Sequence, residues 1–67
     1  MDVFAGRLNE ALRANGMSQG ELAKKINMTK YAVSSYCRGK TKPSFDVLFS
    51  ICKVLNESAD YLLGLTD

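Results

Sequence analysis

The sequence contains no histidine, and this absence removes several common kinds of active site. A histidine-containing zinc site, a Cys–His dyad and a Ser–His–Asp triad all depend on the imidazole side chain. Carboxylate or lysine chemistry stays open in principle, but a helical chain of 67 residues rarely forms the concave pocket that such chemistry needs. The sequence also lacks a glycine-rich phosphate loop and a cluster of metal ligands. We therefore expect neither enzymatic activity nor a cofactor.

Cysteines and long apolar runs are also scarce. The two cysteines, Cys37 and Cys52, are too few for a disulfide framework, and we expect both to remain thiols. No run approaches the roughly 18 apolar residues of a membrane-spanning helix. The opening stretch MDVFAGRLNE lacks the basic region and apolar block of a signal peptide. We therefore expect a cytoplasmic protein without a membrane partner.

Acidic residues are absent from a long central stretch of the chain. Between Leu22 and Phe45 there are six basic residues and none of the seven acidic ones, so this stretch has a formal charge of +6 and the remainder −4. The six are Lys24, Lys25, Lys30, Arg38, Lys40 and Lys42. A charge separated in this way steers a polyanion to one face of a protein. The alternative is chance solvation of exposed helices.

The chain does contain a series of helical patterns, and its length suits one domain with one small core. No stretch alternates convincingly with a period of two, so no sheet is expected. Capping and stop residues divide the patterns into five helices. The first helix runs from about Val3 to Asn15, before the stop residue Gly16, and the second opens at Ser18 with Glu21 and ends at Asn27. The third runs from Thr29 to Gly39, the fourth from Ser44 to about Leu55, and the fifth from Ser58 through ADYLLG. The sequence predicts an all-α, compact five-helix bundle, one domain over residues 1–67.

The second and third helices are joined by about three residues, and this short join restricts their geometry. So tight a connection cannot return the third helix antiparallel along the second, and it forces the steep crossing of a helix-turn-helix. Ala23 lies where the two helices approach, because a larger side chain would hold them apart. Val33 fills the same contact from the other side. We therefore predict a helix-turn-helix at about residues 18–38.

The sequence resembles the Cro/C1-type, lambda-repressor-like (XRE) helix-turn-helix family over nearly its whole length, from about Leu8 to Leu65. The motifs that carry the resemblance are SQGELAKKI, VSSY-x-RGKTKPS and VLNESADYLLGL. The resemblance implies a five-helix DNA-binding domain whose third helix enters the major groove.

This chain departs from the family pattern in two places. Asn27 stands where the family often has glycine, and asparagine keeps the turn feasible. Leu12 and Cys37 stand where the family often pairs an arginine with a glutamate. Since both partners of that ion pair are missing together, we predict a packed apolar contact between Leu12 and Cys37. This contact weighs against a redox role for Cys37.

The resemblance also assigns DNA contacts to particular residues. A helix that faces the major groove needs donors, acceptors and short side chains, and it cannot carry carboxylates close to phosphates. The implied base-reading residues are Lys30, Tyr31, Ser34 and Ser35. The implied phosphate contacts are Gln19, Thr29, Arg38, Lys40 and Lys42. The alternatives are simple helix packing for Tyr31 and a solvated face for the two serines.

Members of this family usually bind inverted repeats as dimers, with half-sites about 34 Å apart. The partners implied are double-stranded DNA and a second copy of the chain, with no small-molecule ligand. An apolar surface away from the basic residues would serve for dimerisation, and the C-terminal stretch offers Tyr61, Leu62, Leu63 and Leu65. Alternatively, all four residues fill the core.

The function expected from this reading is sequence-specific transcriptional regulation, in the form of a repressor that occupies an operator. The chain is then either a minimal regulator or one domain of a longer repressor. One rival is a protein–protein interaction module, which would tolerate acids and exposed apolar residues between Lys24 and Lys42. A close variant of the main reading is the antitoxin half of a toxin–antitoxin pair, for which an additional partner-binding segment is expected. The sequence shows none of these features.

Overall fold

Five α-helices make up most of residues 3–66, the part of the chain that the computed structural model describes. They are α1 (Val3–Ala14), α2 (Gln19–Lys25), α3 (Lys30–Cys37), α4 (Phe45–Leu55) and α5 (Ala59–Leu63). No strand occurs among these residues, which confirms the all-α, five-helix prediction. The ends of the predicted domain, residues 1, 2 and 67, lie outside the described part. None of the helices within it is long and apolar enough to cross a membrane.

Helices α2, α3, α4 and α5 begin at side-chain caps, as the sequence predicted. Ser18, Thr29, Ser44 and Ser58 each accept a hydrogen bond from the backbone N–H three residues later, at 3.0–3.2 Å. The Ser18 N–H in turn donates to Glu21 Oε1 at 2.8 Å, which completes the predicted capping box. These bonds satisfy backbone donors that the first turn of a helix leaves without an intrahelical partner.

All five helices are followed by a residue in the left-handed backbone region. These residues are Gly16, Asn27, Gly39, Asn56 and Gly64, with φ between +55° and +81°. Glycine adopts this region without strain, and asparagine is one of the few other residues that tolerates it. Asn27 therefore forms the turn of the helix-turn-helix, as expected. The first helix ends one residue earlier than predicted, at Ala14.

The core is apolar and receives side chains from every helix. Its fully buried members are Leu8, Leu22, Val33, Ile51, Leu55 and Leu62. Leu12 and Cys37 belong to the same cluster and expose only 5% and 7% of their surface. No polar or charged residue is buried within residues 3–66. The place where the family often has an ion pair is therefore occupied by apolar side chains.

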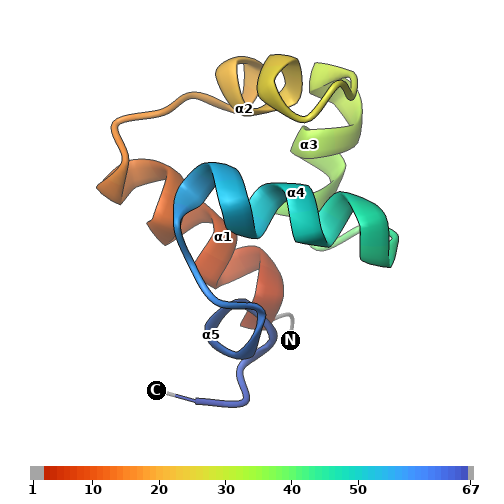
Figure 1. Cartoon of the computed structure of the whole chain (residues 1–67). Helices are drawn as coiled ribbons and strands as arrows, with labels where there is room; N and C mark the ends of the chain where they lie inside the picture. Colours follow the sequence, from red (N-terminus) through yellow and green to blue (C-terminus); the bar gives the residue numbers. More distant parts are fainter. Residues whose placement is uncertain (1–2, 67) are drawn as a thin grey trace.

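The packing of the helices leaves α3 at one edge of the molecule (Figure 1). Helices α2 and α3 cross each other at the top of this view, and α4 runs across the middle. Helix α1 packs against both α3 and α5, while α4 packs against α2 and α5. Ala23, only 3% exposed, lies in α2 where it meets α3, as the steep crossing requires. One side of α3 therefore stays open.

Candidate nucleic-acid interface

The residues of α3 divide between an inner and an outer side. Val33, Tyr36 and Cys37 are buried in the core. On the outer side Lys30 is exposed, and Tyr31 exposes 85% of its surface. Ser34 and Ser35 are half-buried, one turn further along the helix. Since residues four apart lie above one another on a helix, the four polar side chains form two adjacent rows on one face.

The loop that follows α3 folds back onto the second row. The Lys40 N–H donates to the Ser35 carbonyl at 3.0 Å, and Thr41 Oγ1 donates to Ser35 Oγ at 2.8 Å. The Ser35 hydroxyl accepts this bond and keeps its own proton to donate elsewhere. The sequence analysis gave Thr41 no role, although a hydroxyl beside a turn is a recognisable signal for such a bond. The two bonds hold the basic loop against the outer side of α3.

Gln19 links the start of α2 to the end of α3. Burial raises the pKa of the Cys37 thiol, and a hydrogen bond with the Gln19 side chain opposes that rise. An amide has two N–H donors and a carbonyl, so a bond to sulfur leaves capacity for another partner. Cys37 therefore acts as a packing and bonding residue of the helix-turn-helix. Both cysteines are free, as the sequence predicted.

Asn9 of α1 supports the same end of α3. Its Nδ2 donates to the Cys37 carbonyl at 2.9 Å and to the Ala5 carbonyl of its own helix at 2.9 Å. The last carbonyls of a helix have no intrahelical donor, so a bond from a neighbouring helix satisfies one of them. The sequence analysis missed Asn9, because a bond across 28 residues leaves no local signal.

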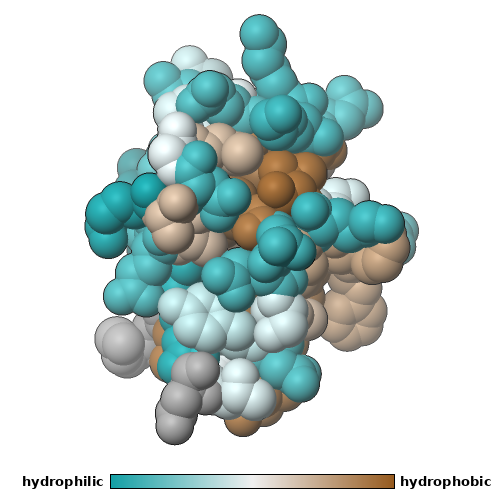
Figure 2. Space-filling view, turned by 60° about the vertical axis from the view of Figure 1, so that its left-hand side comes forward, coloured by the Kyte–Doolittle hydropathy of each residue, from teal (hydrophilic) through white to brown (hydrophobic). Residues whose placement is uncertain are grey.

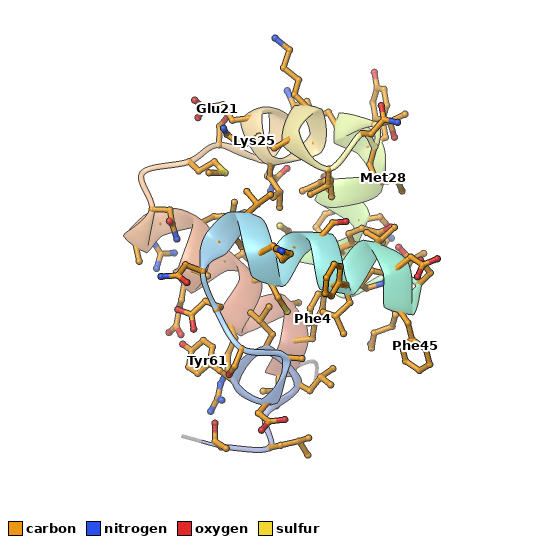
Figure 3. All side chains as sticks on the ribbon, viewed as in Figure 1. Phe4, Glu21, Lys25, Met28, Phe45 and Tyr61 are labelled. Atoms are coloured by element: carbon orange, nitrogen blue, oxygen red, sulfur yellow. The ribbon has the colours of Figure 1, made fainter. Side chains whose placement is uncertain are left out.

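The basic side chains lie on the outside of the molecule. Lys24, Lys25, Lys30, Arg38, Lys40 and Lys42 are all exposed. Lys25 lies on α2 beside Glu21 (Figure 3). The space-filling view shows mostly hydrophilic residues at the top of the molecule, where α2 lies (Figure 2). This part of the surface has the positive charge and the polar groups that a polyanion needs.

Glu21 directly precedes the acid-free stretch, as Asp46 directly follows it, and the Glu21 carboxylate is already hydrogen-bonded. Its carboxylate accepts the Ser18 N–H bond of the capping box. This backbone bond, followed by the bond with the Ser18 hydroxyl, lowers the pKa of Glu21 below its ordinary value. A negative charge at the start of α2 also suits the dipole of the helix.

The four C-terminal residues considered for dimerisation do not share one environment. Leu62 has no exposed surface and belongs to the core, so it cannot contact a partner in this fold. Leu63 and Leu65 are 48% and 70% exposed. The proposed surface therefore loses Leu62, because the inward side of α5 must fill the core first.

Tyr61 is tied to α1 within the same chain. Its hydroxyl donates to Glu10 Oε1 at 3.1 Å, which raises the pKa of the tyrosine. The Arg7 guanidinium lies 4.5 Å from the centre of its ring, and Arg7 Nη1 donates to the Tyr61 carbonyl at 2.7 Å. Arg7 also donates to the Thr66 carbonyl. This cluster joins α1, α5 and the C-terminal stretch (Figure 3).

Two exposed phenylalanines on α4 form a further feature that the sequence analysis left without a role. Phe45 and Phe49 expose 90% and 65% of their surface. Phe45 projects from the first turn of α4, away from the layer of α2 and α3 (Figure 3). The helical spacing of α4 predicts an inward stripe without the two phenylalanines, and the residues of this stripe are buried or partly buried: Val47, Leu48, Ile51, Val54 and Leu55.

Comparisons with known proteins identify relatives over most of the chain. A family model described as Helix-turn-helix (HTH_3) matches residues 8–62. The HTH-type transcriptional regulator ImmR of Bacillus subtilis is 40% identical over 58 residues, which cover 87% of this chain and 46% of ImmR. The uncharacterized HTH-type transcriptional regulator YobD of the same organism is 32% identical over 97% of this chain and 58% of YobD.

A third relative is named as the regulator for a conjugative element. The HTH-type transcriptional regulator for conjugative element SXT of Vibrio cholerae is 34% identical over 92% of this chain and 28% of its own length. The chain thus spans about half of the Bacillus relatives and less of this one. All three matched proteins are named as transcriptional regulators, and none is named as an enzyme.

Proposed function

Because the chain belongs to the Cro/C1-type helix-turn-helix family, we propose that it is a sequence-specific DNA-binding transcriptional regulator whose helix α3 enters the major groove. One observation carries this proposal. The outer side of α3 is polar and basic, in a stretch without a single acidic residue, while all seven acids lie elsewhere. A side chain of this chemistry reads base edges without repulsion from the phosphates.

The base contacts are assigned to the two rows on α3. Lys30 and Tyr31 open the helix, and the first residues of a recognition helix are those that reach the base edges. Lys30 suits guanine O6 and N7, while Tyr31 packs on a thymine methyl or donates its hydroxyl. Ser34 and Ser35, one turn later, are short enough for a base or a phosphate. The Thr41 bond fixes the Ser35 hydroxyl for that purpose.

The phosphate contacts surround these rows. Arg38, Lys40 and Lys42 follow α3, Thr29 caps it, and Gln19 begins α2. Contacts to phosphate position a protein on the duplex but carry little sequence information. Each phosphate that a cation neutralises contributes about −0.9 to the slope of log affinity against log salt concentration.

We further propose that the protein represses transcription as a homodimer on an inverted repeat. The described residues measure 28 × 23 × 21 Å, so one copy is shorter than the ~34 Å of one DNA turn that separates half-sites. A single copy therefore covers one half-site at most. Occupation of a promoter by two copies excludes the polymerase, which is the simplest form of regulation for a domain of this size.

The experiment that tests the function is selection of bound duplexes from a random DNA pool, followed by affinity measurements across salt concentrations. We expect an enriched inverted repeat and a steep salt dependence. Tyr31→Ala should weaken binding to the enriched sequence. The matched control is Arg13→Ala, since Arg13 is exposed on α1 and outside the proposed contacts. A folded protein that enriches no sequence, with weak binding lost at modest salt, would refute the proposal.

A further inference from the structure

The end of α3 is closed by two backbone hydrogen bonds that fix the path of the following loop. The Gly39 N–H donates to the Tyr36 carbonyl at 3.1 Å, and the Lys40 N–H donates to the Ser35 carbonyl at 3.0 Å. With Gly39 in the left-handed region at φ +75°, these are the two bonds of a Schellman motif. The turn directs the chain back along α3, so that Thr41 comes to lie beside Ser35.

The side chain of Thr41 makes a further connection to the same serine. Its Oγ1 donates to Ser35 Oγ at 2.8 Å, the ordinary length of a bond between two hydroxyl groups. Thr41 is exposed and Ser35 is half-buried, so neither side chain belongs to the core. No other hydrogen bond of the Ser35 hydroxyl occurs within residues 3–66. The Thr41 bond therefore sets the orientation of a hydroxyl on the outer side of α3.

The direction of the Thr41 bond decides what the Ser35 hydroxyl offers to a partner. A serine hydroxyl has one proton and two lone pairs, and on its own it suits either a donor or an acceptor. Here Thr41 occupies one of the lone pairs, whereas the proton stays free. A hydroxyl that accepts a bond is polarised and becomes a stronger donor, because hydrogen bonds in a chain reinforce one another. Ser35 therefore presents a donor to whatever lies in front of α3.

We propose that Thr41 is a positioning residue that sets base specificity, because it holds the Ser35 hydroxyl as a hydrogen-bond donor. This inference rests on the proposed function and names the kind of base edge that Ser35 reads. In the major groove guanine presents the acceptors O6 and N7, adenine presents N7 and thymine presents O4, whereas cytosine presents only the N4 donor. The base that Ser35 meets is therefore guanine, adenine or thymine, and cytosine is disfavoured there.

A base edge suits this hydroxyl better than a phosphate does. Ser35 follows Tyr31 by four residues, so the two side chains lie in one row on α3, and Tyr31 is 85% exposed. The neighbouring cations Arg38 and Lys40 already supply the charge that attracts phosphates. A hydroxyl that is held in one orientation also loses less freedom on binding, which favours a directional contact. Thr41 itself acts through Ser35 and needs no contact with the duplex.

The test follows base preference at the single position that Ser35 reads. The selected duplex is varied through all four bases at each position, and the position whose preference is lost in Ser35→Ala identifies the contact. The wild type should bind cytosine at that position about three- to tenfold more weakly than the preferred base, which is the effect of one hydrogen bond. Thr41→Val keeps the shape of the side chain without its hydroxyl, so the discrimination against cytosine should largely disappear.

Further variants separate positioning from a general effect on structure. Thr41→Ser keeps the hydroxyl and should retain the wild-type preference. In the Ser35→Ala background Thr41→Val should not change base preference further, because Thr41 acts through Ser35. Lys40→Ala, in the same loop, should lower affinity evenly for all bases. Circular dichroism checks that each variant is folded, and Thr41→Ala removes the same hydroxyl if Thr41→Val loses its fold.

Several results would overturn the inference. An even loss of affinity for all four bases in Thr41→Val would assign the Ser35 bond to a phosphate. A preference for cytosine at the Ser35 position would show that Ser35 accepts rather than donates. Unchanged preferences in Thr41→Val or in Ser35→Ala would remove the pair from base reading. In each of these cases the wild type still selects a sequence and the proposed function stands, whereas a wild type that selects none refutes both.

Discussion

Asn9 of α1 donates from Nδ2 to the backbone carbonyl of Cys37, the last residue of α3, at 2.9 Å. Gln19 of α2 bonds to the thiol of the same Cys37. The end of the proposed recognition helix is therefore held from two neighbouring helices. In this chain, hydrogen bonds from polar side chains and the packing of a small buried thiol fix the end of α3, where the family often uses an ion pair. No charge is buried within residues 3–66.

Asn9→Ala should lower the free energy of unfolding by about 1–2 kcal/mol, because it leaves the partly buried Cys37 carbonyl without this donor. Urea denaturation followed by circular dichroism measures the change. Arg13→Ala is the matched control, since Arg13 is exposed on the same helix and its loss should cost less than about 0.5 kcal/mol. Equal effects of the two substitutions would show that the Asn9 bond contributes little.

Cys37→Glu should destabilise the protein by about 3–5 kcal/mol, because it places an unpaired carboxylate in the core. Adding Leu12→Arg should restore a large part of the loss, since α1 packs against α3 and both positions lie in one cluster. The measurement is a double-mutant cycle by urea denaturation. If the double variant is no more stable than Cys37→Glu, the two positions do not form the contact that the resemblance implies.

Lys30→Ala should relax base preference at one position of the binding site and cost about 1–3 kcal/mol of affinity for the preferred base. The reason is that its ammonium is the proposed donor to guanine. The measurement compares the wild type and the variant on the selected duplex and on duplexes altered at single positions. Identical preferences in the two proteins would remove Lys30 from the base-reading set.

Lys40→Ala should weaken binding evenly across DNA sequences and reduce the magnitude of the salt slope by about one. Lys40 lies in the loop that the Ser35 bonds hold against α3, so its charge stays near the duplex. Affinity measured at several salt concentrations gives the slope. An unchanged slope, with the protein folded, would count against a phosphate contact for Lys40.

The capping box should make stability depend on pH in the acidic range. The pKa of Glu21 is lower in the folded chain than in the unfolded chain, because the carboxylate accepts the Ser18 backbone bond. Its contribution is therefore complete above the ordinary glutamate pKa of about 4.3 and is lost as the pH falls through the lowered value. The Glu21→Gln variant keeps the geometry of the capping box but has no carboxyl group to titrate there. Its free energy of unfolding should therefore fall less on acidification than that of the wild type. Unfolding curves at several pH values compare the two.

The helices were predictable because their signals are local. Nearby residues alone predict the helix starts at Ser18, Thr29, Ser44 and Ser58 and the turn at Asn27, with no information from elsewhere in the chain. The exposure of α3 also followed from the pattern, because its inner residues repeat at helical spacing. What these exposed residues contact on DNA stays a prediction.

Contacts between distant segments were not predictable in the same way. The pattern of α5 could not decide whether Leu62 or Leu65 faces inward, since both are leucines near the end of the chain. The attachment of Tyr61 to Arg7 and Glu10 joins residues more than 50 positions apart. The inward stripe of α4, from Val47 to Leu55, was predicted from its helical spacing, and Phe45 and Phe49 lay outside that stripe without an assigned role.

The three shortest helices of the fold have a consequence for how the protein can be dissected. Helices α2, α3 and α5 have seven, eight and five residues, whereas isolated helices below about 12–15 residues are marginal in water. A peptide containing only residues 18–38 would therefore be mostly unstructured. Amide hydrogen exchange should show that α3 opens only when the whole domain unfolds, so the DNA-reading helix and the core behave as a single cooperative unit.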